Sequence, residues 1–186
     1  MVRVENQMKD KTMVCLDVYY YEDYANACGI VFETEPEERV LADYSEVVKP
    51  IAEYIPGEFY KRELPCLLKV IDKIQETIDL IIIDSFVWLG NGKKGLGVHL
   101  YEALSEKIPV IGVAKTHFKD CAQYTEVYRG KSKKPLYVSA IGIELDYSTE
   151  LIKKLKGDHR IPDLLKRVDQ LSRTKIELAN DCLNQS

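Results

Sequence analysis

The stretch Asp79-Leu80-Ile81-Ile82-Ile83-Asp84-Ser85 decides the fold. Its centre is wholly apolar, and a short Ile-rich run between polar residues is typical of a parallel strand buried on both faces. Ligands of open α/β sheets gather at the carboxyl ends of such strands, which is where Asp84 stands. A second apolar run, residues 13–16, ends at Asp17. Two acids at neighbouring strand ends need a positive partner, and a divalent metal is the simplest one.

The pattern around this strand predicts an α/β fold. Before it, three apolar runs with short connections indicate an antiparallel meander, and Pro65 fits the first position of a helix that continues to about Thr77. After it, the pattern alternates between helices and strands, with a parallel strand at residues 109–115. The expected elements are strands at 14–18, 29–33, 40–44, 80–84, 109–115 and 136–143, and helices at 65–77, 98–107, 148–156 (with Ser148 as a possible cap) and 163–180. By analogy, this is the layout of a ribonuclease H-like fold, with a three-strand antiparallel meander continued by parallel strands and with helices on both faces.

Length and composition indicate a single domain, residues 1–186, of ordinary soluble type. The five cysteines are widely spaced and form no Cys-x-x-Cys pair, so we expect small core residues in a reducing compartment. The three histidines have no zinc spacing. Neither a signal peptide nor an apolar run of membrane-spanning length is present, so we expect a cytoplasmic protein without membrane contact. Because no extended apolar surface is evident, we expect a monomer.

Charge is distributed unevenly. The formal net charge is −4, yet residues 89–134 hold nine Lys/Arg against four Asp/Glu. This segment, including Lys93 and Lys94, is able to face phosphate, and we expect these two lysines to bind nucleic acid. A solvated surface explains the same charge equally well.

Between the meander and the Asp84 strand, the sequence resembles the endonuclease V family, the deoxyinosine 3′ endonucleases. Tyr54-Ile55-Pro56-Gly57 and Arg62-Glu63 stand where the family carries Tyr-Ile-Pro-Gly and Phe-Arg-Glu, with Lys61 in place of the phenylalanine. Four further segments follow the family pattern in register over about residues 14–172. They are Asp17, Asp84, Gly112-Val113-Ala114-Lys115, and Arg160-Ile161-Pro162 with Arg167-Val168-Asp169.

The resemblance implies a metal-dependent endonuclease that hydrolyses a phosphodiester 3′ to inosine in DNA, leaving a 3′-hydroxyl and a 5′-phosphate. It assigns Asp17, Glu63 and Asp84 to Mg²⁺, for which Mn²⁺ substitutes, because these hard cations prefer oxygen ligands. It adds Asp169 to the catalytic acids. It also implies that Lys115 holds the scissile phosphate or positions the attacking water. Taken singly, each of these residues also suits a turn cap or a solvated surface. Their joint occurrence favours the site.

The resemblance makes Tyr54, Ile55, Pro56 and Gly57 a wedge pressed into the duplex beside a displaced base. A surface turn is the alternative. The tyrosine run 19–21 suits edge packing better than base stacking. The loop after Asp84 departs from the family because residues 85–94 contain no histidine, and Ser139-Ala140-Ile141-Gly142 replaces Ser-Pro-Gly-His. Base recognition therefore stays open between inosine in DNA, inosine in RNA, and other lesions or structures.

Two other functions fit parts of the chain. Residues 90–95 match the G-x-G-x-x-G pattern of dinucleotide-binding proteins, but residues 85–89 separate the first glycine from the strand, and the next strand ends in Lys115 rather than in an acid. The second alternative is a protein that has a nuclease-like fold and binds its ligand but has lost the catalytic chemistry. The presence of all four acids argues against it.

Overall fold

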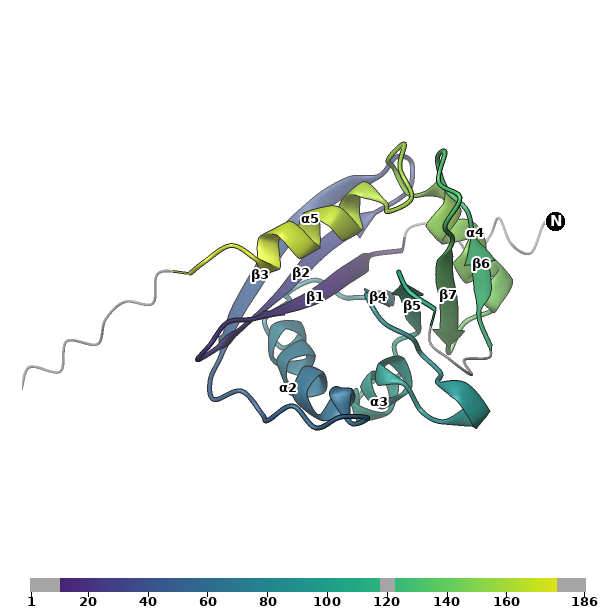
Figure 1. Cartoon of the computed structure of the whole chain (residues 1–186). Helices are drawn as coiled ribbons and strands as arrows, with labels where there is room; N and C mark the ends of the chain where they lie inside the picture. The colour runs from purple at the N-terminus through teal and green to yellow at the C-terminus, as the bar shows by residue number, and fades with distance from the viewer. Residues whose placement is uncertain (1–10, 118–122, 177–186) are drawn as a thin grey trace, which may run out of the picture.

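The computed structural model describes residues 11–117 and 123–176. One mixed sheet of seven strands runs through the molecule in the order β3-β2-β1-β4-β5-β7-β6 (Figure 1). The strands are β1 (Met13–Tyr20), β2 (Ala25–Glu33), β3 (Arg39–Val48), β4 (Leu80–Ile83), β5 (Val110–Ala114), β6 (Thr125–Val127) and β7 (Leu136–Ile141). The helices are α2 (Phe59–Ile71), α3 (Leu96–Ala103), α4 (Leu145–Lys154) and α5 (Asp163–Ser172), with a short 3₁₀ turn η1 (Gly90–Gly92).

The topology confirms the meander and its parallel continuation. β1, β2 and β3 pair antiparallel in chain order, while β4 pairs parallel with both β1 and β5. The parallel part ends at β5, because β7 runs antiparallel to it and β6 antiparallel to β7. The sequence pattern did not indicate β6. Three residues with mixed burial are too few to establish an alternating pattern.

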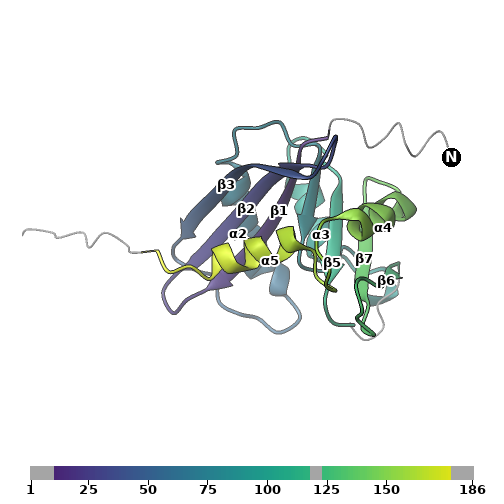
Figure 2. The same ribbon diagram turned by 90° about the horizontal axis from the view of Figure 1, so that it is seen from above.

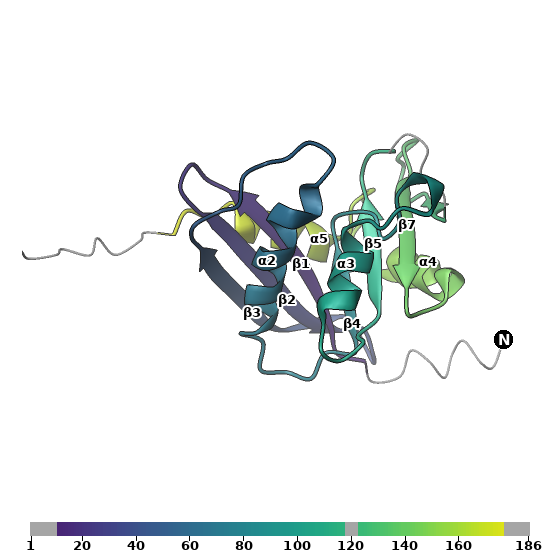
Figure 3. The same ribbon diagram turned by 90° about the horizontal axis from the view of Figure 1, so that it is seen from below.

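Helices cover both faces of the sheet, as expected. Figures 1 and 3 place α2 and α3 on one face, and Figures 1 and 2 place α5 on the other. Side chains alternate between the two layers along each strand. In β4, Ile81 and Ile83 belong to the core under α2 and α3, whereas Leu80 and Ile82 belong to the core under α4 and α5. The unbroken apolar run is therefore buried on both faces, as the sequence predicted.

The prediction that α2 begins at Pro65 was wrong. The helix begins at Phe59 and carries Pro65 inside it. A proline inside a helix removes one backbone hydrogen bond and usually costs about 3 kcal/mol or more. Tertiary packing outweighs that local preference, since Cys66, Leu67 and Val70 are all buried against the sheet. The helix also stops at Ile71, well before Thr77.

Two predictions about the last helices also need correction. Ser148 does not cap its helix, because α4 begins three residues earlier and the Ser148 hydroxyl donates to the Glu144 carbonyl from inside the helix. α5 ends at Ser172, and the end expected at residue 180 lies outside the described residues.

Cys15, Cys28 and Cys66 are buried free thiols, while Cys121 and Cys182 lie outside the described residues. In the described part of the chain, no helix has both the length and the apolar character required to cross a membrane.

Candidate active site

The parallel pairing of β1 and β4 brings two acids together. Leu16 lies opposite Ile83, so the next residue on each strand, Asp17 and Asp84, follows at the same edge of the sheet. Asp17 remains within β1, which continues to Tyr20 through its pairing with β2, whereas Asp84 begins the loop after β4. The buried strand that decides the fold therefore also places the first two acids of the site.

Asp17 faces α5. The Ser172 hydroxyl donates to Asp17 Oδ2 at 2.5 Å and lies near the C-terminal end of that helix. Burial raises the pKa of the Asp17 carboxyl, and the charges of Asp84 and Asp169 raise it further, while the hydrogen bond from Ser172 opposes them. Asp17 thus lies in a negative and largely dehydrated environment.

Glu63 reaches the same region from α2 on the opposite face of the sheet. It is only 8% exposed, and the Tyr20 hydroxyl donates to Glu63 Oε2 at 2.8 Å. Burial raises the pKa of the Glu63 carboxyl to about 8, with added contributions from the charges of Asp17 and Asp84. A carboxylate as buried as this one is costly unless a cation compensates its charge.

Lys115 supplies one compensating charge. It directly follows β5, the strand next to β4, and its Nζ lies 2.5 Å from Asp84 Oδ2 in a partly exposed ion pair. The Arg160 guanidinium donates to the backbone carbonyl of Lys115 and to that of Pro135, so it holds the strand end in place.

Asp169 lies at the border of this group. It forms a two-pronged ion pair with Arg173, at 3.0 Å from Nε and 3.1 Å from Nη2. Its charge also raises the pKa of Asp17. Asp169 is therefore near the other acids, but Arg173 already partners it.

The three central carboxylates share one arrangement. Each has one oxygen bound by a neighbouring donor: Tyr20 for Glu63, Lys115 for Asp84 and Ser172 for Asp17. Such outer partners typically orient metal ligands. Among residues 11–117 and 123–176, no three His, Cys, Asp or Glu side chains lie close enough together to hold one metal ion as they are placed. The donor set suits a hard divalent cation in chemistry and charge, but the side chains would have to move before they could share one.

A family model described as Endonuclease V matches residues 1–170 of this chain. The chain belongs to the endonuclease V family. It is accordingly a nuclease, a hydrolytic enzyme that acts on nucleic acid. Endonuclease V of Clostridium acetobutylicum is 29% identical over 174 residues, which cover 80% of this chain and 72% of that protein. Endonuclease V of Streptomyces avermitilis is 26% identical over 187 residues, covering 88% of this chain and 80% of the relative.

Solved endonuclease V structures share the fold. The Bacillus subtilis protein superposes with a TM-score of 0.74 at 22% identity, covering 92% of this chain and 86% of that one. The Ciona intestinalis protein, in complex with a 23-mer DNA containing an inosine followed by a ribo-adenosine, gives a TM-score of 0.72 at 18% identity, covering 92% and 91%. The ribonuclease H-like class expected from the sequence is confirmed.

Residues 54–57, which the sequence predicts to act as a wedge, form an exposed turn. The Glu58 amide donates to the Ile55 carbonyl at 3.0 Å, and Gly57 adopts a φ of +81°, a conformation that favours glycine. Tyr54 and Ile55 are 59% and 45% exposed, and the nearby Phe59 is 43% exposed. Apolar side chains held outside the core are available for contact with another molecule.

Lys93 and Lys94 lie in the loop before α3. Lys94 pairs with Glu102 at 2.7 Å, which reduces its availability for phosphate, while Lys93 is exposed. The loop geometry does not reproduce a dinucleotide fingerprint, because η1 starts seven residues after the end of β4 and the Gly95 amide is bonded to the Val87 carbonyl.

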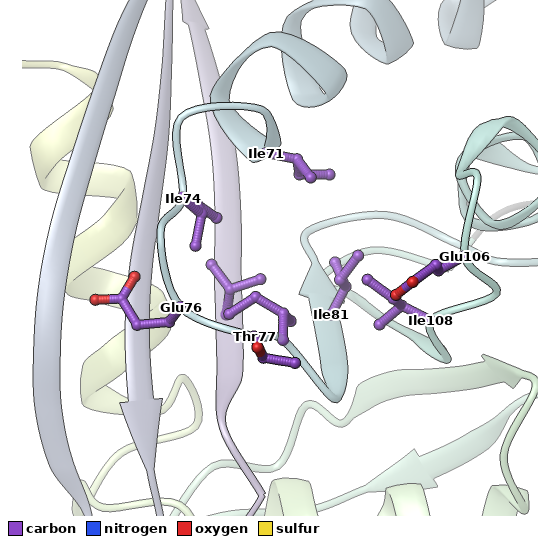
Figure 4. A pocket seen from close by; sticks show the side chains of 9 residues that line it. Ile71, Ile74, Glu76, Thr77, Ile81, Glu106 and Ile108 are labelled. Atoms are coloured by element: carbon purple, nitrogen blue, oxygen red, sulfur yellow. The ribbon is translucent and has the colours of Figure 1, made fainter.

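A separate pocket lies at the other end of the parallel strands. Figure 4 shows Ile71, Ile74 and Ile81 around it, with Glu76 and Glu106 at its sides. These residues come from the end of α2, from the beginning of β4 and from the connections that precede β4 and β5. Asp17 and Asp84 of the candidate site lie toward the carboxyl ends of the same strands, so this pocket is distinct from that site.

Sequence reasoning missed two of the three donors that hold the acids, Tyr20 and Ser172. Tyr20 was assigned to edge packing, yet its hydroxyl binds Glu63, and the Arg62 guanidinium lies 3.8 Å from the centre of its ring. The available signal was strand parity, since Tyr20 shares the face of Leu16 and Val18. Ser172 carried no signal, because only the docking of α5 on β1 brings it to Asp17.

Proposed function

We propose that this endonuclease hydrolyses the phosphodiester bond 3′ to inosine in DNA, with Mg²⁺ or Mn²⁺ held by Asp17, Glu63 and Asp84. The observation that carries the proposal is the convergence of the three acids. The register of β1 and β4 brings Asp17 and Asp84 to one edge of the sheet, and the buried Glu63 of α2 is close enough for its pKa to be raised by both. The DNA bound by the Ciona intestinalis relative supports the choice of inosine.

The proposed roles follow from where the side chains lie. When bound, the divalent cation activates the attacking water and neutralises charge on the phosphate. Tyr20 and Ser172 orient the carboxylates that hold it. Lys115 pairs with Asp84 in the metal-free protein. If a cation bound the Asp84 carboxylate, the Lys115 ammonium would be free to pair with a phosphate oxygen instead. Asp169, with Arg173, completes the acidic group from α5.

Tyr54, Ile55, Pro56 and Gly57 would separate the base pair at the lesion. Their exposure supports this role, because inserted apolar groups compensate for lost base stacking. Lys93 and its neighbour Lys94 would contact the backbone, the latter after leaving Glu102.

We further propose that residues 1–186 act as a single domain and as a monomer in the cytoplasm. The continuous seven-stranded sheet supports one domain. Three of the five exposed large apolar side chains among the described residues fall in the wedge region, which leaves little apolar surface for a dimer. The buried free thiols of Cys15, Cys28 and Cys66 suit a reducing compartment.

The test is a cleavage panel of four matched oligonucleotides: inosine DNA, inosine RNA, mismatched DNA and undamaged DNA, each with Mg²⁺, Mn²⁺ or chelator. The proposal predicts metal-dependent cutting of inosine DNA that leaves a 5′-phosphate. RNA cleavage in preference to DNA would reassign the substrate, which the altered loop after Asp84 makes an instructive outcome. Absence of cutting with either metal on every substrate would overturn the proposal.

A further inference from the structure

The connection between β6 and β7, residues 128–135, forms a basic loop. Its three lysines, Lys131, Lys133 and Lys134, are all exposed. None of them pairs with an acid anywhere in residues 11–117 and 123–176. Exposed lysines elsewhere do pair, as Lys61 does with Glu58 and Lys153 with Glu150. The basic loop is therefore a concentration of uncompensated positive charge.

The strand register places this loop beside the active site. β7 runs antiparallel to β5 with Tyr137 opposite Ala114, so the start of β7 lies next to the end of β5, where Lys115 stands. Val127 at the end of β6 lies opposite Leu136, so residues 128–135 extend beyond the sheet at that same edge. In Figure 1 the loop between β6 and β7 stands beside the connection from α4 to α5. The carboxylates and the basic loop thus share one edge of the sheet.

Two arginines fix the loop at both ends. Arg129, only 6% exposed, donates to several carbonyls of the α4–α5 connection, including that of His159 at 3.1 Å. Arg160 donates to the Pro135 carbonyl at 3.1 Å from Nε, and the same guanidinium binds the carbonyl of Lys115. A single side chain therefore joins the base of the basic loop to the strand end that carries the catalytic lysine.

Hydrogen bonds also hold the interior of the loop. The Ser132 hydroxyl donates to the Lys134 carbonyl at 3.0 Å and accepts from the Lys134 amide at 3.1 Å. Tyr128 is 56% exposed at its start, with its hydroxyl donating to Glu126, the acid next to the loop on β6. Because the backbone is held, the lysines are presented from a fixed base, which reduces the entropy lost when they bind a ligand.

We propose that the basic loop is a phosphate clamp that holds the nucleic-acid backbone beside the scissile phosphate. This proposal rests on the proposed function, because the ligand of the loop is the phosphodiester backbone of the strand that is cut in the site containing Asp84. Regularly spaced phosphates are the complement of three unpaired lysines on one loop, and each contact releases a condensed counterion. Lysine contacts to phosphate fix the position of the strand without reading its sequence. The loop thereby positions the substrate and does not select the base.

The test compares the salt dependence of DNA binding by wild type and by Lys131→Gln/Lys133→Gln/Lys134→Gln. Binding to an inosine duplex is measured by fluorescence anisotropy in chelator between 50 and 200 mM salt, so that no cutting occurs. Loss of two to three contacts lowers the slope of log K against log salt by about 2 to 3. Over this fourfold range, wild type then loses about 15 to 60 times more affinity than the variant.

A matched control is Lys69→Gln/Lys73→Gln/Lys153→Gln. It removes the same total charge from exposed lysines in α2, just after α2 and in α4, and it should leave the slope unchanged. In metal-dependent cleavage, the loop variant should raise KM at least fivefold with kcat within twofold of wild type. Equal melting temperatures of all three proteins exclude a folding effect.

The outcomes separate the two proposals. A wild type that cleaves, together with a loop variant whose slope and KM match the control, overturns the phosphate clamp and leaves the nuclease function standing. An equal loss of slope in the control and loop variants also overturns it, because total charge then explains the effect. A wild type that neither binds nor cuts any oligonucleotide overturns the proposed function itself.

Discussion

Replacing Glu63 with glutamine should stabilise the metal-free protein at alkaline pH. Burial and the charges of Asp17 and Asp84 raise the pKa of Glu63 from an ordinary 4.5 to about 8 in the folded state. Below about pH 4.5 this group is protonated in both states, so it costs nothing. Between pH 4.5 and 8 the unfolded chain releases the proton while the folded chain retains it, so stability falls as pH rises. Above pH 8 the loss is complete.

The magnitude follows from that window. Each pH unit within it removes about 1.4 kcal/mol of stability, so the whole window amounts to roughly 5 kcal/mol. Glutamine keeps the size of Glu63 and still accepts the hydrogen bond from Tyr20. Glu63→Gln should therefore match wild type within about 1 kcal/mol at pH 4.5 and exceed its unfolding free energy by about 5 kcal/mol at pH 8.5.

The assay is urea unfolding in chelator at pH 4.5, 6.5 and 8.5, followed by circular dichroism for both proteins. Taking the difference between the proteins cancels the titration of the groups that do not interact with Glu63. Repeating the pH 8.5 measurement with saturating Mg²⁺ should shrink the advantage of the variant, because the cation stabilises the wild-type carboxylate. A difference that stays constant across pH would refute the reasoning, since Glu63 would then titrate normally.

Three further substitutions test single parts of the site. Asp84→Asn should lower cleavage at least a thousandfold with the fold intact by circular dichroism, because it removes a carboxylate of the acidic group; activity within tenfold of wild type would remove Asp84 from the mechanism. Tyr20→Phe should lower kcat about 10- to 100-fold with little change in KM, because Glu63 loses its orienting donor; single-turnover cleavage measures this, and an unchanged rate would limit Tyr20 to packing. Ile55→Ser should leave unfolding free energy within about 0.5 kcal/mol, since Ile55 is 45% exposed. The same change should reduce cleavage of an inosine duplex at least fivefold but not of an inosine single strand, and equal effects on both would argue against a wedge.

The sheet was predictable because each of its central strands contains an apolar run in the sequence. β1, β4 and β5 contain long stretches of buried side chains, and their order along the chain determines the parallel core. The start of α2 was not predictable, because Pro65 is a strong local signal that the packing of Cys66, Leu67 and Val70 overrides. β6 was missed for a different reason. Its pairing with β7 is a tertiary contact that three residues cannot encode.

The acids of the candidate site could be proposed from short motifs, but their partners could not. Asp17 and Asp84 stand at the ends of recognisable strands, so position alone singles them out. Tyr20 and Ser172 act through contacts with residues 43 and 155 positions away in the chain, and no local pattern reports such distances. For Lys94, the residue was predicted but its partner was not. It was expected to contact phosphate, and in the structure it pairs with Glu102.

The central claim is that one divalent cation joins Asp17, Glu63 and Asp84. Anomalous diffraction from a crystal soaked in Mn²⁺ tests it most directly. We expect a peak within about 2.0–2.3 Å of one oxygen from each of the three carboxylates, with Lys115 displaced from Asp84. A peak that touches other residues, or that leaves Glu63 without a contact, would contradict it.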